Sequence, residues 1–153
     1  RPDGGLSANR EGVNVLLARW ADLCVDQDLP SAADVADGAQ RLSGSVRASA
    51  KFCEAPLLVF VTPGAPEAQQ SATYARATRE ASERLALALA DLAHVHVFGE
   101  LELLRACTSL GGAFHCPFLE RAARTPYTPL MFSCLAGAVT RQLVRAVAPL
   151  RKV

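Results

Sequence analysis

The stretch "APLLVFVTP", residues 55–63, constrains the possible fold more than any other part of the chain. It is a continuous apolar run that ends in Thr62, Pro63 and Gly64, and its apolar positions do not alternate with polar ones. A strand with two apolar faces is typical of a parallel sheet that helices cover on both sides. The run therefore predicts a buried central strand, and the segments around it should supply the helices.

Two other short runs are predicted to be strands, namely "GVNVLLARW" (residues 12–20) and "VHVFG" (residues 95–99). The segments between the three runs have helical patterns. In residues 29–53, Ser31 followed by Asp34 predicts a capping box, and apolar residues then recur at helical spacing. Gly44 weakens this helix without ending it. Residues 64–93 read as one long helix with an apolar face from Tyr74 to Leu92.

The last third of the chain predicts a short helix over residues 100–107, a loop over 108–125, and a final helix. Thr128 is the expected N-cap of that helix and Pro129 its first residue. The apolar face of the helix is expected at Phe132, Leu135, Val139 and Leu143.

Strands that alternate with helices indicate parallel pairing through right-handed crossovers. We expect one α/β domain over residues 1–153, with a mostly parallel sheet and helices on both faces, in three layers. Flavodoxin-like and SGNH-hydrolase-like folds have this architecture. Three strands make a thin sheet, so we expect a further first strand to precede residue 1.

Composition excludes several classes of function. The net charge is +1, and the scattered basic residues show no bias toward nucleic acid or acidic membranes. No stretch approaches the roughly 20 apolar residues of a membrane span, and no signal peptide opens the chain. The five cysteines are odd in number and lack a paired spacing, which favours reduced thiols. We therefore expect a cytoplasmic domain, cut from a larger protein.

Few residues carry recognisable chemistry. His94 and His96 could hold a metal on one strand face, but no third ligand stands nearby, so a solvent-facing strand end is favoured. His115 beside Cys116 could activate a thiol, although sequence neighbours rarely align for this. Neither a Gly-x-Ser-x-Gly elbow nor a glycine-rich phosphate loop is present.

These observations leave a short set of candidates. Thr62 lies in the loop after the second strand, where open α/β sheets bind ligands, and we predict it as a binding contact; the alternative is a loop that only turns the chain. His115 is the one catalytic candidate, and neither a metal site nor a cofactor is expected within residues 1–153.

Four segments together resemble one known family. They are "LSANREGVNVLLARWADL" (residues 6–23), "APLLVFVTPGAP" (55–66), "AHVHVFGELELL" (93–104) and "RTPYTPLMFSCLAGAVTRQLVRAVAPLRKV" (124–153). The chain resembles the amino-terminal, SGNH-hydrolase-like domain of FkbH-like proteins. The resemblance implies a following phosphatase-like domain of the haloacid dehalogenase superfamily. That family takes a glyceryl unit from 1,3-bisphosphoglycerate, removes its phosphate and loads it onto an acyl carrier protein in polyketide biosynthesis. Mg²⁺ is the cofactor implied for the parent family.

The loop before the final helix departs from the family pattern. Cys116 and Pro117 stand where the family has Asp-Pro, and Glu120 replaces a second Asp. Phe118 and Arg124 stand where the family has histidines. The resemblance therefore implies a domain that has lost proton-transfer groups while keeping its structural Pro-Tyr-Thr-Pro.

We accordingly expect a non-catalytic domain that docks a phosphopantetheinylated acyl carrier protein or the downstream phosphatase-like domain. The predicted contacts comprise loop residues and surface arginines: Arg121, Arg124, Tyr127, Thr128, Arg76, Arg79 and Arg84. The alternative for the arginines is that they only solvate helix faces.

Three other functions stay open. An SGNH-type esterase or acyltransferase would use His115. A purely structural domain inside a megasynthase would use none of these residues. A receiver-like signalling module would need Asp22, Asp26 and Lys51, and Lys51 is misplaced for that role.

Overall fold

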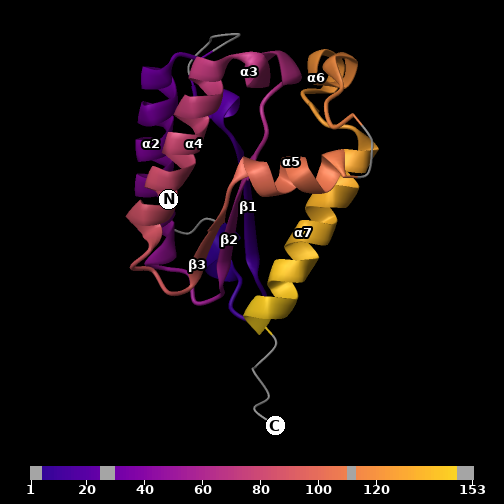
Figure 1. The fold of residues 1–153 in the computed structure, drawn as a ribbon. Coiled ribbons are helices and arrows are strands. Elements are labelled where there is room, and N and C mark those ends of the chain that lie inside the picture. Colours follow the sequence, from indigo (N-terminus) through magenta and orange to yellow (C-terminus); the bar gives the residue numbers. More distant parts are fainter. Residues whose placement is uncertain (1–4, 25–29, 110–112, 148–153) are drawn as a thin grey trace. The chain divides into compact units, whose positions relative to one another are not determined.

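The computed structural model describes residues 5–24, 30–109 and 113–147 (Figure 1). Within these residues, three strands form a parallel sheet, with β1 (Asn14–Arg19) beside β2 (Leu57–Thr62) and β2 beside β3 (Val95–Phe98). Leu17 lies opposite Phe60, which in turn lies opposite Phe98. The predicted α/β class, with parallel strands that alternate with helices, is confirmed.

The chain divides into two compact units, Arg1–Glu100 and Leu101–Val153. Besides the sheet, the first unit holds α1 (Gly5–Ala8), the 3₁₀ helix η1 (Trp20–Leu23), α2 (Ala32–Ala50), α3 (Pro66–Gln70) and α4 (Ala72–Leu89). The second holds α6 (Pro117–Ala123) and α7 (Pro129–Val147), and α5 (Glu100–Thr108) begins at the boundary. A single domain over residues 1–153, with a further strand before them, stays a prediction.

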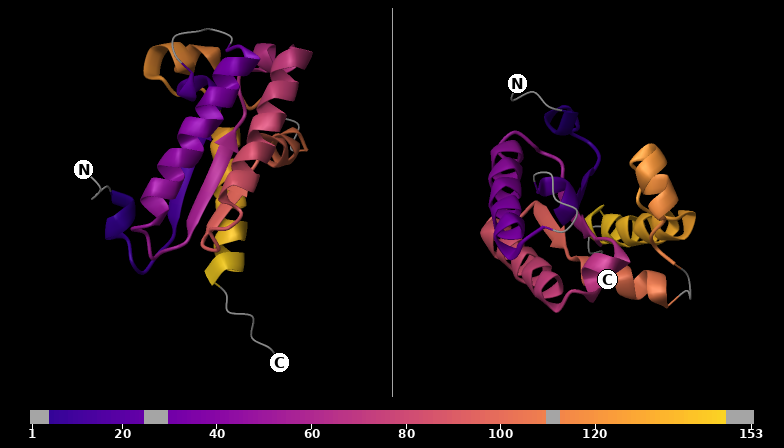
Figure 2. Two further views of the ribbon diagram at one scale, coloured as in Figure 1. Left: turned by 90° about the vertical axis from the view of Figure 1, so that its left-hand side faces the viewer. Right: turned by 90° about the horizontal axis from the view of Figure 1, so that it is seen from above.

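The core of the first unit lies between the sheet and the helix pair α2 and α4, which lie side by side on one face (Figure 2). Leu57, Val59 and Val61 of β2 belong to this core. The alternate residues Leu58 and Phe60 point to the other face and are also fully buried. β2 is therefore apolar on both faces, as its sequence predicts. Helix cover of the second face stays a prediction.

The start of α2 has the structure that its sequence predicts. Ser31 and Asp34 form the predicted capping box, in which the Asp34 amide donates to Ser31 Oγ and the Ser31 amide donates to Asp34 Oδ2. The expected apolar stripe is buried, and α2 continues through Gly44. Local capping and periodicity in the sequence therefore predict where this helix begins and which of its faces is buried.

Two predicted boundaries are wrong. The long helix over residues 64–93 is broken at Ser71, because the Ser71 hydroxyl caps α4 by accepting from the Tyr74 amide and so starts a second helix. The predicted loop over residues 108–125 contains α6, which starts at Pro117 and ends at a left-handed Arg124.

The final helix begins at Pro129 as predicted, and the Met131 amide donates to Thr128 Oγ1. Of its expected apolar face, Leu135 is buried and Val139 and Leu143 are half-buried, but Phe132 is exposed. Met131 and Cys134 are buried as well. Within the described residues, no helix is long and apolar enough to cross a membrane.

Candidate functional site

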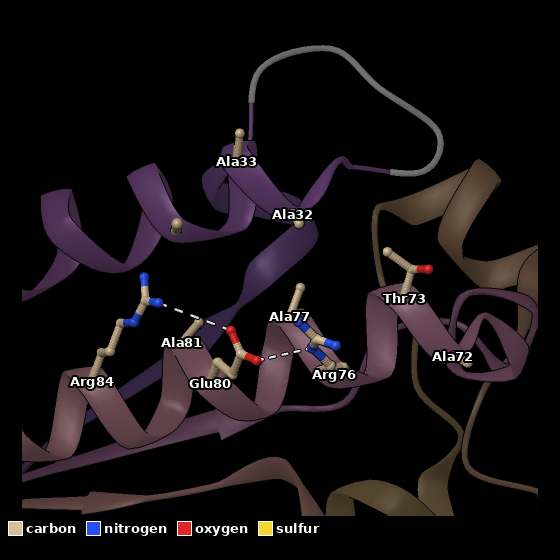
Figure 3. Close-up of a pocket in the computed structure, with 10 residues that line it drawn as sticks. Ala32, Ala33, Ala72, Thr73, Arg76, Ala77, Glu80, Ala81 and Arg84 are labelled. Atoms are coloured by element: carbon tan, nitrogen blue, oxygen red, sulfur yellow. Dashed lines mark hydrogen bonds and ion pairs between the residues drawn. The ribbon is translucent and has the colours of Figure 1, made fainter.

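A groove runs along the surface of the first unit between α2 and α4 (Figure 3). Its volume is about 600 Å³. Alanine side chains make up most of its lining, and the full set is Ala32, Ala33, Ala36, Ala72, Thr73, Arg76, Ala77, Glu80, Ala81 and Arg84. The groove is therefore apolar along its floor and carries charge along one wall.

The periodicity of the two helices creates this groove. On α4 the lining residues recur at each turn from Ala72 to Arg84, so they share one face of the helix. On α2 they come from its first two turns. Alanine has the highest helix propensity, so the alanines stabilise both helices that form the walls. Because their side chains are small, they leave a space between the helices that larger side chains would fill.

Three charged residues of α4 line the groove in the order basic, acidic, basic. The Arg76 Nε atom lies 3.0 Å from Glu80 Oε1, and an Arg84 guanidinium nitrogen lies 3.9 Å from Glu80 Oε2 (Figure 3). Both arginine side chains are mostly exposed, at 82% and 66%. One carboxylate therefore lies between two guanidinium groups, and their summed charge is positive.

Thr62, which the sequence predicts as a binding residue in the loop after the second strand, is instead the last residue of β2 and pairs with Arg19 of β1. Its side chain is buried, and its hydroxyl donates to the Ala18 carbonyl oxygen at 3.2 Å. The Thr62 side chain thus forms a hydrogen bond between β2 and β1 in this structure.

Glu100, which is not among the residues predicted from the sequence, is a buried carboxyl just after β3. The residue is only 4% exposed. Thr78 Oγ1 donates to it at 2.6 Å, Gln69 Nε2 donates at 3.2 Å, and the Gly64 amide donates as well. Burial raises the pKa of Glu100, and these hydrogen bonds oppose the rise. Its place directly after a strand and a glycine, at the carboxyl edge of the sheet, is the signal that could have found it.

The second unit holds the catalytic candidate His115. Its side chain is 5% exposed, and its Nε2 atom lies 2.8 Å from Glu120 Oε2. Backbone bonds close the loop around it: the Cys116 amide donates to Pro126, and the Thr128 amide donates to Phe114. The structure therefore brings His115 to a carboxylate within this loop.

The other predicted residues of this loop lie in two settings. Arg121 and Arg124 are exposed, and Arg124 has a left-handed backbone with φ of 54°. Tyr127 is buried and meets Phe132 edge to face. Thr128 donates from its hydroxyl to the Ala113 carbonyl oxygen at 2.7 Å. Tyr127 and Thr128 thus support the loop, and the two arginines are open to a partner.

The five cysteines, His94 and His96 show no reactive arrangement. All five cysteines are free thiols in the structure. Burial raises the pKa of Cys107, and its hydrogen bond with Cys134 raises it further. His94, predicted on the third strand, lies just before β3, with its Nε2 atom 3.2 Å from the Ala50 carbonyl oxygen, whereas His96 lies on β3 and is exposed. The described residues contain no group of three or more His, Cys, Asp or Glu side chains placed to hold a metal ion.

No family model, no curated protein and no solved structure matches the chain.

A receiver-like module was predicted to need Asp22 and Asp26 as acidic residues. Asp22 pairs with Arg19 at 2.6 Å, and Asp26 lies outside the described residues.

Proposed function

We propose that this chain is a docking domain for an acidic protein partner, and that the partner is an acyl carrier protein. In the full proposal, it is the non-catalytic, SGNH-hydrolase-like domain of a cytoplasmic FkbH-like protein. It helps a following phosphatase-like domain load a glyceryl unit onto the phosphopantetheine arm of the carrier protein. The resemblance described from the sequence supports this assignment.

The groove between α2 and α4 is the observation that carries the proposal. Its apolar floor offers area for contact, and Arg76 and Arg84 give its rim a positive charge. Complementary charge steers an acidic partner and fixes its orientation. Two of the three α4 arginines predicted from the sequence as partner contacts line this groove.

To test the proposal, the isotope-labelled protein is titrated with a phosphopantetheinylated acyl carrier protein, and binding is measured from changes in its amide chemical shifts. We expect the shifts to concentrate on α2 and the first half of α4. The Arg76→Glu change should weaken binding about tenfold, because it places a like charge against the partner. Arg141→Glu on α7 is the matched control, since Arg141 is also exposed and lies in the other unit. Shifts confined to residues 113–128 would instead place the contact at Arg121 and Arg124.

A second candidate function rests on the His115–Glu120 pair. A carboxylate that holds a histidine ring is one part of an esterase or acyltransferase triad. Hydrolysis of a short-chain ester should then fall at least about hundredfold in His115→Ala, the usual scale for loss of a general base. His96→Ala is the control, because His96 is exposed on β3. An equal rate in both variants would remove this candidate.

A further inference from the structure

The dimensions of the groove suggest the kind of segment that fits it. Along α4 the lining extends from Ala72 to Arg84. Twelve residues of helix rise about 18 Å, which is about the length of three turns of a second helix. The alanine floor lets another helix approach closely, since small side chains permit interaxial distances near 8 Å.

The walls of the groove favour a helical occupant over an extended one. Beyond their first turns, α2 and α4 use their own backbone groups in intrahelical hydrogen bonds, so the helix faces along the groove offer no continuous row of free donors and acceptors. An extended peptide would leave its backbone without partners there. A helix satisfies its own backbone and can place leucine or methionine side chains between the alanines.

The charge order along the rim makes the choice of partner more specific. Arg76, Glu80 and Arg84 are each one turn apart on α4, and they read basic, acidic, basic. A partner helix alongside them is best matched by the opposite order. A uniformly acidic helix would bring a like charge against Glu80, which is unfavourable.

We propose that the groove binds an amphipathic helix that presents an acid, a base and an acid at three successive turns beside its apolar face. The inference rests on the proposed docking function and names the element of the partner that the groove recognises. It does not depend on the partner being an acyl carrier protein.

Two labelled peptides of about 18 residues, long enough to populate a helix, test this charge order. Both have the same composition and the same leucine face. One carries Glu, Lys and Glu at successive turns, and the other carries Lys, Glu and Glu. Fluorescence anisotropy should show that the full chain binds the first at least about tenfold more tightly, because the second sets two like-charge pairs against the rim.

A charge-swapped variant is the matched control. The combined changes Arg76→Glu, Glu80→Arg and Arg84→Glu keep two opposite-charge pairs at four-residue spacing, so α4 retains its local support. This variant should lose the preference for the Glu-Lys-Glu peptide and bind a Lys-Glu-Lys peptide instead. Equal binding of all peptides to both proteins, or no binding of any, would overturn the inference.

A second variant tests the groove itself. Ala36→Leu with Ala77→Leu fills the floor at two half-buried helical positions, and leucine is a good helix former. Circular dichroism should show an intact helix content while both peptides lose affinity. Unchanged peptide affinity would exclude the groove. Tight peptide binding without carrier-protein binding would instead overturn only the proposed function.

Discussion

Glu100 places an ionisable carboxyl in the interior of the first unit. The described residues that reach it are Thr78, Gln69 and the amide of Gly64, and all three are uncharged donors. A negative charge there is stabilised by hydrogen bonds alone, while burial disfavours it. The balance makes this residue a source of pH dependence in folding.

We predict that Glu100 makes the folded state more stable at acid pH than at neutral pH. Because burial raises its pKa above the ordinary 4.5, the folded chain holds the proton more tightly than the unfolded chain. Its contribution is fully present below about pH 4.5 and is lost as the pH rises through the folded pKa.

Urea unfolding of the wild type and of Glu100→Gln over a series of pH values measures this contribution. The free-energy difference between the two isolates Glu100, because all other titrating groups are common to both. We expect the wild type to lose stability relative to the variant as the pH rises. A difference that is flat with pH, or that slopes the other way, would contradict the prediction.

At the scale of single elements, capping hydrogen bonds at helix ends contribute to stability. Ser31→Ala should lower the free energy of unfolding by about 1 kcal/mol, because it removes the acceptor for the Asp34 amide and breaks the capping box. Ser45→Ala is the control at an exposed interior position of the same helix, where alanine should be neutral or slightly stabilising. Chemical denaturation of both variants measures the contrast, and equal losses would contradict it.

Near the end of α6, substitution by glycine is expected to stabilise the second unit at one position and to destabilise it at another. Arg124 has φ of 54°, a conformation that glycine adopts without strain, so Arg124→Gly should stabilise the second unit by up to about 1 kcal/mol. Arg121→Gly lies inside the helix and should destabilise it by about the same amount. Thermal unfolding of the two variants would show melting temperatures that move apart; a shift of both in one direction would contradict the assignment.

The elements differ in how far their sequence predicts them. The capping box, the buried β2 run and the Thr128–Pro129 helix start are local signals, and all three are confirmed. The break at Ser71 was missed because serine inside a helical pattern can either cap or simply face solvent. The ending of α6 at a non-glycine residue leaves little signal in the sequence.

The site was predicted only in part, for a physical reason. The arginines of α4 could be named because surface charge is visible in sequence, but the groove needs α2 and α4 side by side. Its alanines read as ordinary helix formers until that pairing is known. Glu100 likewise reads as an exposed acid at a helix start, and only tertiary packing buries it.

At the scale of the whole molecule, the strand order of the sheet predicts which strand is most resistant to local unfolding. β2 has a neighbour on each side and is buried along its whole length, whereas β1 and β3 each pair with one described strand. Native-state hydrogen exchange should therefore be slowest for the amides of β2, which need global unfolding to exchange. Equal or stronger protection of β1 or β3 would contradict this ranking.

The same strand order has a consequence for how the protein is made. Each strand pairs with its neighbour in sequence, and Glu100, the last residue of the first unit, bonds back to α3 and α4. Every sheet contact of that unit is thus available before residue 101 emerges from the ribosome. Since domains generally fold in the order of synthesis, the first unit can acquire its sheet and its groove while the second is still being translated.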